Sequence, residues 1–120
     1  MRTTYLWFLQ LVTGVLIAVL LGTHMVIQHL DAILDFFGIE VTEPTSWASM
    51  IDRASQGIFV ALYIALLAVG LYHGINGLRG IILEVTPSAR TGRIVTWVLI
   101  VFGIIIFGWG TWVPFYLLAS

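Results

Sequence analysis

Three long runs of apolar residues dominate the chain, at residues 5–30, 56–83 and 94–118. Each is close to the roughly 20 residues that a helix needs to cross a bilayer. The bilayer core offers no water to backbone N–H and C=O groups, so each run is expected to be helical. The pattern predicts an all-α membrane protein with three transmembrane helices, forming one domain over residues 1–120.

Polar residues concentrate in the two connections, residues 31–55 and 84–93. In the longer connection, residues 31–39 could form a short helix at the membrane surface. The sequence Glu43-Pro44-Thr45-Ser46 is typical of the start of another helix.

Composition agrees with a membrane protein. With 60% hydrophobic and only 9% charged residues, the chain has too little polar surface to cover a soluble domain. It has no cysteine, which excludes disulfides, thiolate metal sites and cysteine-ligated iron–sulfur clusters within this chain. Arg2 is the only positively charged residue before the first apolar run, and this run is longer than the apolar segment of a cleaved signal peptide usually is. We therefore expect this span to be retained.

Charge predicts the orientation in the membrane. Arg2 precedes the first span, and Arg79, Arg90 and Arg93 surround the turn at 84–93. The connection 31–55 carries five acidic residues and one arginine. By the positive-inside rule the N-terminus and the 84–93 turn lie in the cytoplasm, and the acidic loop and the C-terminus lie outside. We therefore expect a multi-pass protein of the cytoplasmic membrane. An aromatic belt is expected at its outer face, comprising Trp47, Trp109, Trp112 and Tyr116.

Two histidines, His24 and His73, lie inside the apolar runs. An imidazole in hydrocarbon is costly unless something holds it, so each is a candidate functional residue. With a rise of about 1.5 Å per residue, His24 lies roughly 28 Å beyond Tyr5, and His73 roughly 16 Å from Glu84. The two are then displaced by about 12 Å along the membrane normal. If both bind haem, each serves a different iron and needs an imidazole from a second subunit.

A structural role is the alternative for each histidine. Intramembrane histidines often hydrogen-bond between helices or face a water-filled cavity, and for His24 alone that interpretation is preferred. His29 lies at the outer boundary, where contact with water requires no ligand role.

The surroundings of His73 favour a ligand role. Gly70, Gly74 and Gly77 recur around it at helical spacing and are expected to clear one face. Arg79 follows near the cytoplasmic end, where it could pair with a haem propionate, although topological anchoring alone would also explain it. Histidine-ligated haem b suits this set of residues.

Residues 72–84, YHGINGLRGIILE, resemble the second-helix signature of the membrane-anchor subunits of succinate dehydrogenase and fumarate reductase. The matching histidine of that family is an axial ligand of haem b, which carries over to His73. In the first span, residues 11–16 and 22–24 also resemble the family. In members with two haems, a histidine near the outer end of this helix ligates the distal haem, which carries over to His24.

The resemblance implies half of a two-subunit haem-binding helical bundle within a four-subunit succinate:quinone oxidoreductase. The partners are a second anchor, an iron–sulfur subunit and a flavoprotein; nucleic acid is not expected. This chain is expected to be a non-catalytic anchor of the D type, sharing two haems b, or at least one, and helping electrons reach quinone. The outer His24 favours menaquinone. No residue of this chain is assigned a catalytic role.

Two departures from the family pattern concern the quinone pocket. Gln10 stands about where many anchors have an arginine, so the pocket is expected to be furnished mainly by the partner. The acid–tyrosine pair that often ends the second-helix motif is Glu84-Val85 here, which leaves no phenol at that position.

Two other functions stay open. One is the cytochrome b subunit of another membrane oxidoreductase, such as a hydrogenase or formate dehydrogenase, although those usually have more spans and more histidines. The other is a small transport or assembly protein without a cofactor. That function predicts acidic residues near the histidines within the membrane, and the sequence has none there.

Overall fold

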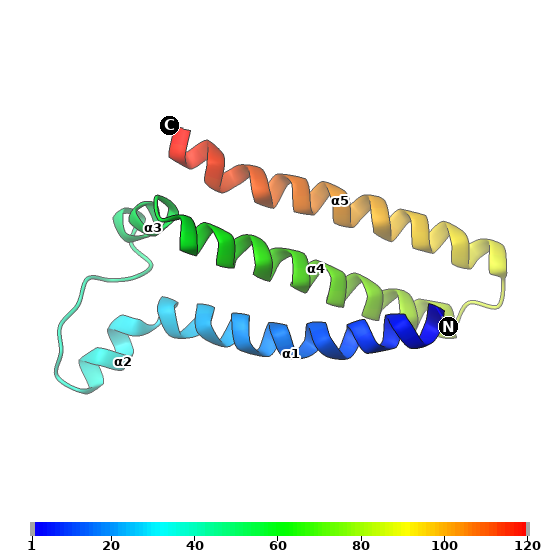
Figure 1. Cartoon of the computed structure of the whole chain (residues 1–120), viewed down its shortest axis with the longest axis horizontal. Helices are drawn as coiled ribbons and strands as arrows, with labels where there is room; N and C mark the ends of the chain where they lie inside the picture. The colour runs from blue at the N-terminus through cyan, green and yellow to red at the C-terminus, as the bar shows by residue number, and fades with distance from the viewer. Residues whose placement is uncertain (1, 120) are drawn as a thin grey trace.

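The computed structural model describes residues 2–119 of the chain, and within them it contains only helices (Figure 1). The five helices are α1 (Arg2–Gln28), α2 (Leu30–Phe36), α3 (Trp47–Ala54), α4 (Gly57–Glu84) and α5 (Ala89–Ala119). Helices α1, α4 and α5 are long and apolar enough to cross a membrane, which confirms the predicted all-α fold with three spans.

The helices extend beyond some of the apolar runs. Helix α1 begins at Arg2, three residues before the predicted span, and α5 begins at Ala89, five residues before it. A membrane span is the apolar part of a helix, whereas the backbone hydrogen bonds continue into polar sequence. Hydropathy therefore locates the membrane segment and not the helix end.

The long connection contains the two short helices that its sequence predicts. Helix α2 is closed by Gly38, whose φ of +76° suits glycine. The N–H groups of Gly38 and Ile39 donate to the carbonyls of Asp35 and Leu34, each at 2.9 Å, as in a Schellman motif. At the start of α3, the Ser46 hydroxyl accepts from the Ser49 N–H at 3.3 Å and so caps the helix.

Helix α4 is the central element of the fold. It packs against α1 on one side and α5 on the other, whereas α1 and α5 make no close approach within the described chain (Figure 1). Glycines of α5 permit one of these contacts: a Cβ added at Gly103 would lie 2.5 Å from Ile75 Cδ1. The domain is a flat layer of about 58 × 35 × 22 Å, roughly two helix diameters thick.

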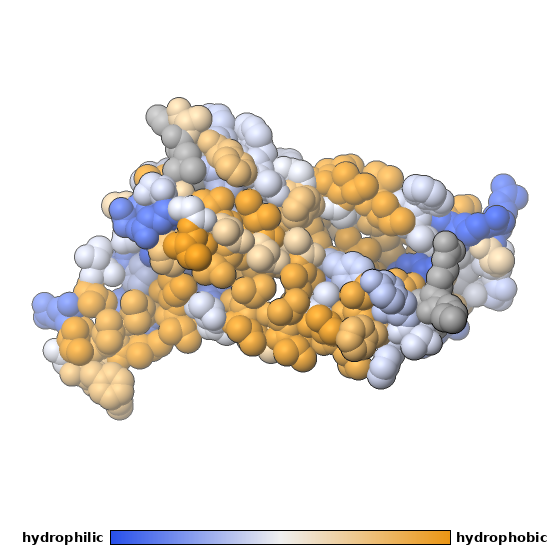
Figure 2. Space-filling model, in the orientation of Figure 1, coloured by the Kyte–Doolittle hydropathy of each residue, from blue (hydrophilic) through white to orange (hydrophobic). Residues whose placement is uncertain are grey.

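This layer has no apolar core of its own. None of the apolar side chains described between residues 4 and 119 is a buried core residue, and large apolar side chains are exposed along all three long helices. Figure 2 shows the resulting apolar band between two more hydrophilic ends of the molecule. The band needs lipid or another protein to cover it.

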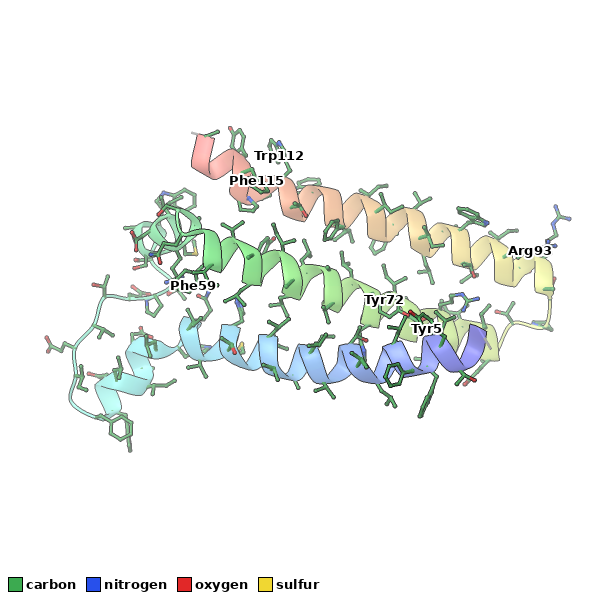
Figure 3. The ribbon with its side chains drawn as sticks, in the orientation of Figure 1. Tyr5, Phe59, Tyr72, Arg93, Trp112 and Phe115 are labelled. Atoms are coloured by element: carbon green, nitrogen blue, oxygen red, sulfur yellow. The ribbon has the colours of Figure 1, made fainter. Side chains whose placement is uncertain are left out.

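The two ends of the layer differ as the charge pattern predicts. The N-terminus and the α4–α5 turn with Arg93 lie at one end, and the acidic connection and the C-terminus lie at the other (Figures 1 and 3). Trp109 and Trp112 are exposed on the last part of α5, and Trp112 stacks on Tyr116 with ring centroids 4.7 Å apart. The predicted aromatic residues therefore lie on the surface of that half.

Candidate functional site

His73 lies where α4 packs against α1. Its Nδ1 is 3.2 Å from the hydroxyl oxygen of Thr13. A Cβ added at Gly14 would lie 3.3 Å from Cε1 of the imidazole, so the ring rests directly on the α1 backbone. The Thr13-Gly14 pair thus supplies one hydroxyl and the space for one ring at the level of His73.

A polar network fixes the same region of the two helices. The side-chain amide of Gln10 donates to the backbone carbonyl of His73 at 3.0 Å. Asn76 Nδ2 in turn donates to Gln10 Oε1 at 2.8 Å. Both amides belong to half-buried side chains, where such hydrogen bonds hold membrane helices together.

This network changes the role of one predicted glycine. A Cβ at Gly77 would lie 3.1 Å from Gln10 Nε2, so Gly77 makes room for Gln10. The expectation that Gly77 clears space for a ligand is therefore wrong. Added Cβ atoms at Gly70 and Gly74 meet nothing within 4 Å, so these two glycines do leave an open surface beside His73.

His24 also faces α4, at a different level. It is exposed and lines two adjoining hollows, one of them with Tyr63, Leu66 and Gly70 of α4. Because His73 contacts Thr13 and Gly14, His24 lies ten residues further along α1, about 15 Å away by helical rise. The structure does not bring the two imidazoles together, in agreement with the separation predicted from the sequence.

The other hollow is an open pocket of about 300 Å³ lined by residues of α1, α3, α4 and α5. Its walls are mostly apolar and include Phe59 and Pro114, and Figure 3 shows Phe59 at the start of α4. Polar side chains of the lining include His24, Tyr63 and Arg53, whose NH2 group donates to the Pro44 carbonyl. The pocket therefore combines an imidazole, a phenol and a guanidinium with mostly apolar walls. Arg53 was not predicted as a site residue, because its place in the same pocket as His24 depends on how α3 folds back.

Arg79 lies on the opposite side of α4 from His73. Its Nε donates to the hydroxyl oxygen of Thr96 on α5 at 2.8 Å, and that hydroxyl donates to the Gly92 carbonyl at 2.9 Å. The other guanidinium nitrogens make no hydrogen bond within the described chain. The structure does not place Arg79 beside the His73 ring.

His29 and Glu84 lie at the margins of the layer. His29 is exposed at the junction of α1 and α2, and Glu84 is the exposed last residue of α4. Neither makes a hydrogen bond through its side chain within residues 2–119. Their positions agree with contact with water or lipid headgroups.

A haem fits the donor set better than a metal ion bound by protein groups alone. Among residues 2–119, no three His, Asp or Glu side chains gather as they would around a bare ion. A porphyrin would supply four iron ligands itself, so such a group would need only one imidazole from this chain and one from a partner. His73 offers such an imidazole beside an open surface, and His24 offers one at an open pocket.

Comparison with known proteins decides the family. Residues 2–111 match the model of the succinate dehydrogenase/fumarate reductase transmembrane subunit. The chain belongs to this family. Membership confirms the family that the sequence resembles and sets aside a subunit of a hydrogenase or formate dehydrogenase and a transport or assembly protein.

Two curated relatives carry the name succinate dehydrogenase hydrophobic membrane anchor subunit. The protein from Archaeoglobus fulgidus is 30% identical over 84 residues, which are 70% of this chain and 64% of the relative. The protein from Thermoplasma acidophilum is 30% identical over 104 residues, 87% of this chain and 78% of the relative. No solved structure matches the chain. Both relatives are anchor subunits of an enzyme, which agrees with a non-catalytic anchor role here.

Proposed function

We propose that this membrane anchor ligates an inner haem b through His73, sharing the iron with a histidine of a second anchor subunit. The observation that carries this proposal is an imidazole fixed between two helices next to the open surface at Gly70 and Gly74. A structural role would use the ring to join α1 and α4, but it would not require an unfilled surface beside it. When bound, haem supplies a one-electron redox centre.

The chain's own contribution is to hold and orient the imidazole. Thr13 contacts one ring nitrogen, and Gln10 fixes the backbone of the same residue. Immobilised ligands lower the reorganisation that accompanies electron transfer, and the apolar surroundings tune the potential.

We further propose that His24 ligates a second, outer haem. His24 lies about 15 Å from the level of His73 along α1. This distance is too long for the two imidazoles to share one iron, and it suits a second haem. Arg53 in the same pocket provides a cation near the outer membrane surface, where a propionate could be neutralised. Arg79 is proposed to serve an inner propionate through the guanidinium nitrogens that Thr96 does not engage.

The complete assembly is proposed to be a succinate:quinone oxidoreductase. A flavoprotein would oxidise succinate, an iron–sulfur subunit would carry the electrons to the membrane, and the two anchors would deliver them to quinone, here menaquinone. The apolar layer supports a second anchor, since it has no core of its own. Gln10 is engaged by His73 and Asn76, so quinone-binding groups are expected to come mainly from the partner.

We place the N-terminus in the cytoplasm of a cell whose cytoplasmic membrane holds the complex.

Haem content of purified complexes tests both ligands. His73→Ala should remove the inner haem and His24→Ala the outer one, each lowering the b-type α band relative to flavin and eliminating one step of a potentiometric titration. His29→Ala is the matched control, because His29 is exposed at the end of α1, and it should leave both haems in place.

The outcomes separate the two assignments. A full inner haem signal in the His73→Ala complex would overturn the main proposal. Wild-type haem content after His24→Ala would restrict the chain to one haem. The absence of any b-type band in the wild-type complex would refute both.

A further inference from the structure

Thr13 is the one polar side chain described as buried in residues 4–116, with 9% of its surface exposed. Its hydroxyl lies 2.8 Å from the Leu9 carbonyl and 3.1 Å from the Gln10 carbonyl, besides the 3.2 Å contact with His73 Nδ1. A hydroxyl has a single proton to donate and two lone pairs with which to accept. Its proton can therefore serve only one of these three neighbours well.

The distances decide which neighbour receives the proton. The 2.8 Å contact to Leu9 is at the usual length of an O–H···O bond, and donation to the carbonyl four residues earlier is typical of helical threonines. The 3.2 Å contact is within the range of an N–H donor to oxygen. If the Thr13 hydroxyl donates to Leu9, it accepts from His73, and the ring then carries its proton on Nδ1.

A neutral imidazole with its proton on Nδ1 has its lone pair on Nε2, which is the form that binds a metal. Nε2 makes no hydrogen bond within the described chain, whereas Nδ1 is engaged by Thr13. We propose that Thr13 is a positioning residue that fixes the tautomer and the ring plane of His73 and so presents Nε2 to the haem iron. This inference rests on the proposed ligand role of His73.

An acceptor on the second ring nitrogen has two effects on a metal-bound imidazole. It holds the ring in one orientation, and it increases the basicity of the coordinating nitrogen. A more basic ligand favours ferric over ferrous iron and lowers the reduction potential. Losing such a partner typically weakens metal binding on the order of 10–100-fold.

Thr13→Val tests the inference, since valine keeps the shape of threonine and lacks the hydroxyl. In the purified complex, we expect the inner haem to have a higher midpoint potential, altered low-spin ferric g values in electron paramagnetic resonance, and easier loss of haem. Thr13→Ser restores the hydroxyl and should return all three properties toward wild type.

Thr23→Val is the matched control on the same helix. Thr23 makes the same type of bond, donating to the Val19 carbonyl at 2.8 Å, but it is exposed and does not contact His73. The inner haem should be unaffected by this change. Such a result would show that losing a hydroxyl from α1 does not by itself explain the effect of Thr13→Val.

The possible results distinguish this inference from the proposed function. Wild-type potential and g values in Thr13→Val, with the inner haem still lost in His73→Ala, would overturn the role of Thr13 and leave the ligand assignment standing. A Thr13→Val complex that contains no inner haem is interpreted through Thr13→Ser: recovery supports the inference, and failure to recover contradicts it. An inner haem that survives His73→Ala refutes the proposed function itself.

Discussion

At the scale of residues, the candidate chemistry could be predicted but its contacts could not. His73 and His24 were identifiable from their apolar surroundings, and their separation follows from helical rise alone. Thr13 gave no comparable signal, because a threonine in a transmembrane helix usually bonds to its own backbone. Only the packing of α1 on α4 reveals that the same hydroxyl also contacts an imidazole.

Gln10 illustrates the same limit. From the family resemblance, Gln10 stands about where an arginine was expected, and the prediction was that the partner mainly furnishes the quinone pocket. The structure instead shows its amide joining α1 to the backbone of His73 and to Asn76. Which side chain of a neighbouring helix it reaches depends on the relative rotation and register of the two helices, and neither is encoded in local spacing.

Arg79 carries a prediction at the residue scale. Removing its positive charge in Arg79→Leu should lower the midpoint potential or the occupancy of the inner haem, because the guanidinium is proposed to neutralise an inner propionate, and a cation there favours the reduced, less positive centre. Redox titration of the purified complex measures the change.

The control for this variant is Arg93→Leu, which removes a cation at the same end of the molecule (Figure 3). It should leave the inner midpoint unchanged. If Arg79→Leu also leaves it unchanged, Arg79 serves only in topology and in its hydrogen bond to Thr96.

At the scale of elements, three spans follow from the apolar runs with little ambiguity, since only helices of this length satisfy their backbone in lipid. The short helices α2 and α3 were also predictable. Residues 31–39 were expected to form a short helix, and the sequence ending in Ser46 is typical of a helix start, where Ser46 caps α3 in the structure. The central position of α4 was not, since all three spans are similarly apolar all round. What brings α4 and α5 together is the local fit of small and large side chains.

One such fit gives a test at the element scale. Gly103→Ala would place a Cβ 2.5 Å from Ile75 Cδ1, and we expect a loss of about 1 kcal/mol from overpacking between α4 and α5. Thermal unfolding of the purified complex measures it.

A compensating change makes the test specific. Adding Ile75→Val to Gly103→Ala removes the clashing methyl group, so the double variant should recover stability relative to the single one. Equal stability of Gly103→Ala and wild type, or no recovery in the double variant, would contradict this account of helix packing.

At the scale of the whole molecule, the chain is a flat layer, which we propose to be half of a functional unit. Its helices bury no apolar core among the described residues, while one histidine faces an open surface and the other an open pocket. The sequence alone predicted a partner, because two histidines at different depths could not both ligate one haem. The geometry of a proposed second anchor depends on another chain and could not be predicted from this sequence.

The most direct test of the central claim is the structure of the intact assembly, determined by electron cryomicroscopy and inspected beside the ring of His73. The account predicts a porphyrin lying over Gly70 and Gly74, with its iron bonded to Nε2 of His73 and to an imidazole of the second anchor. Lipid or a packed helix in that place, with no porphyrin in contact with the ring, would contradict it.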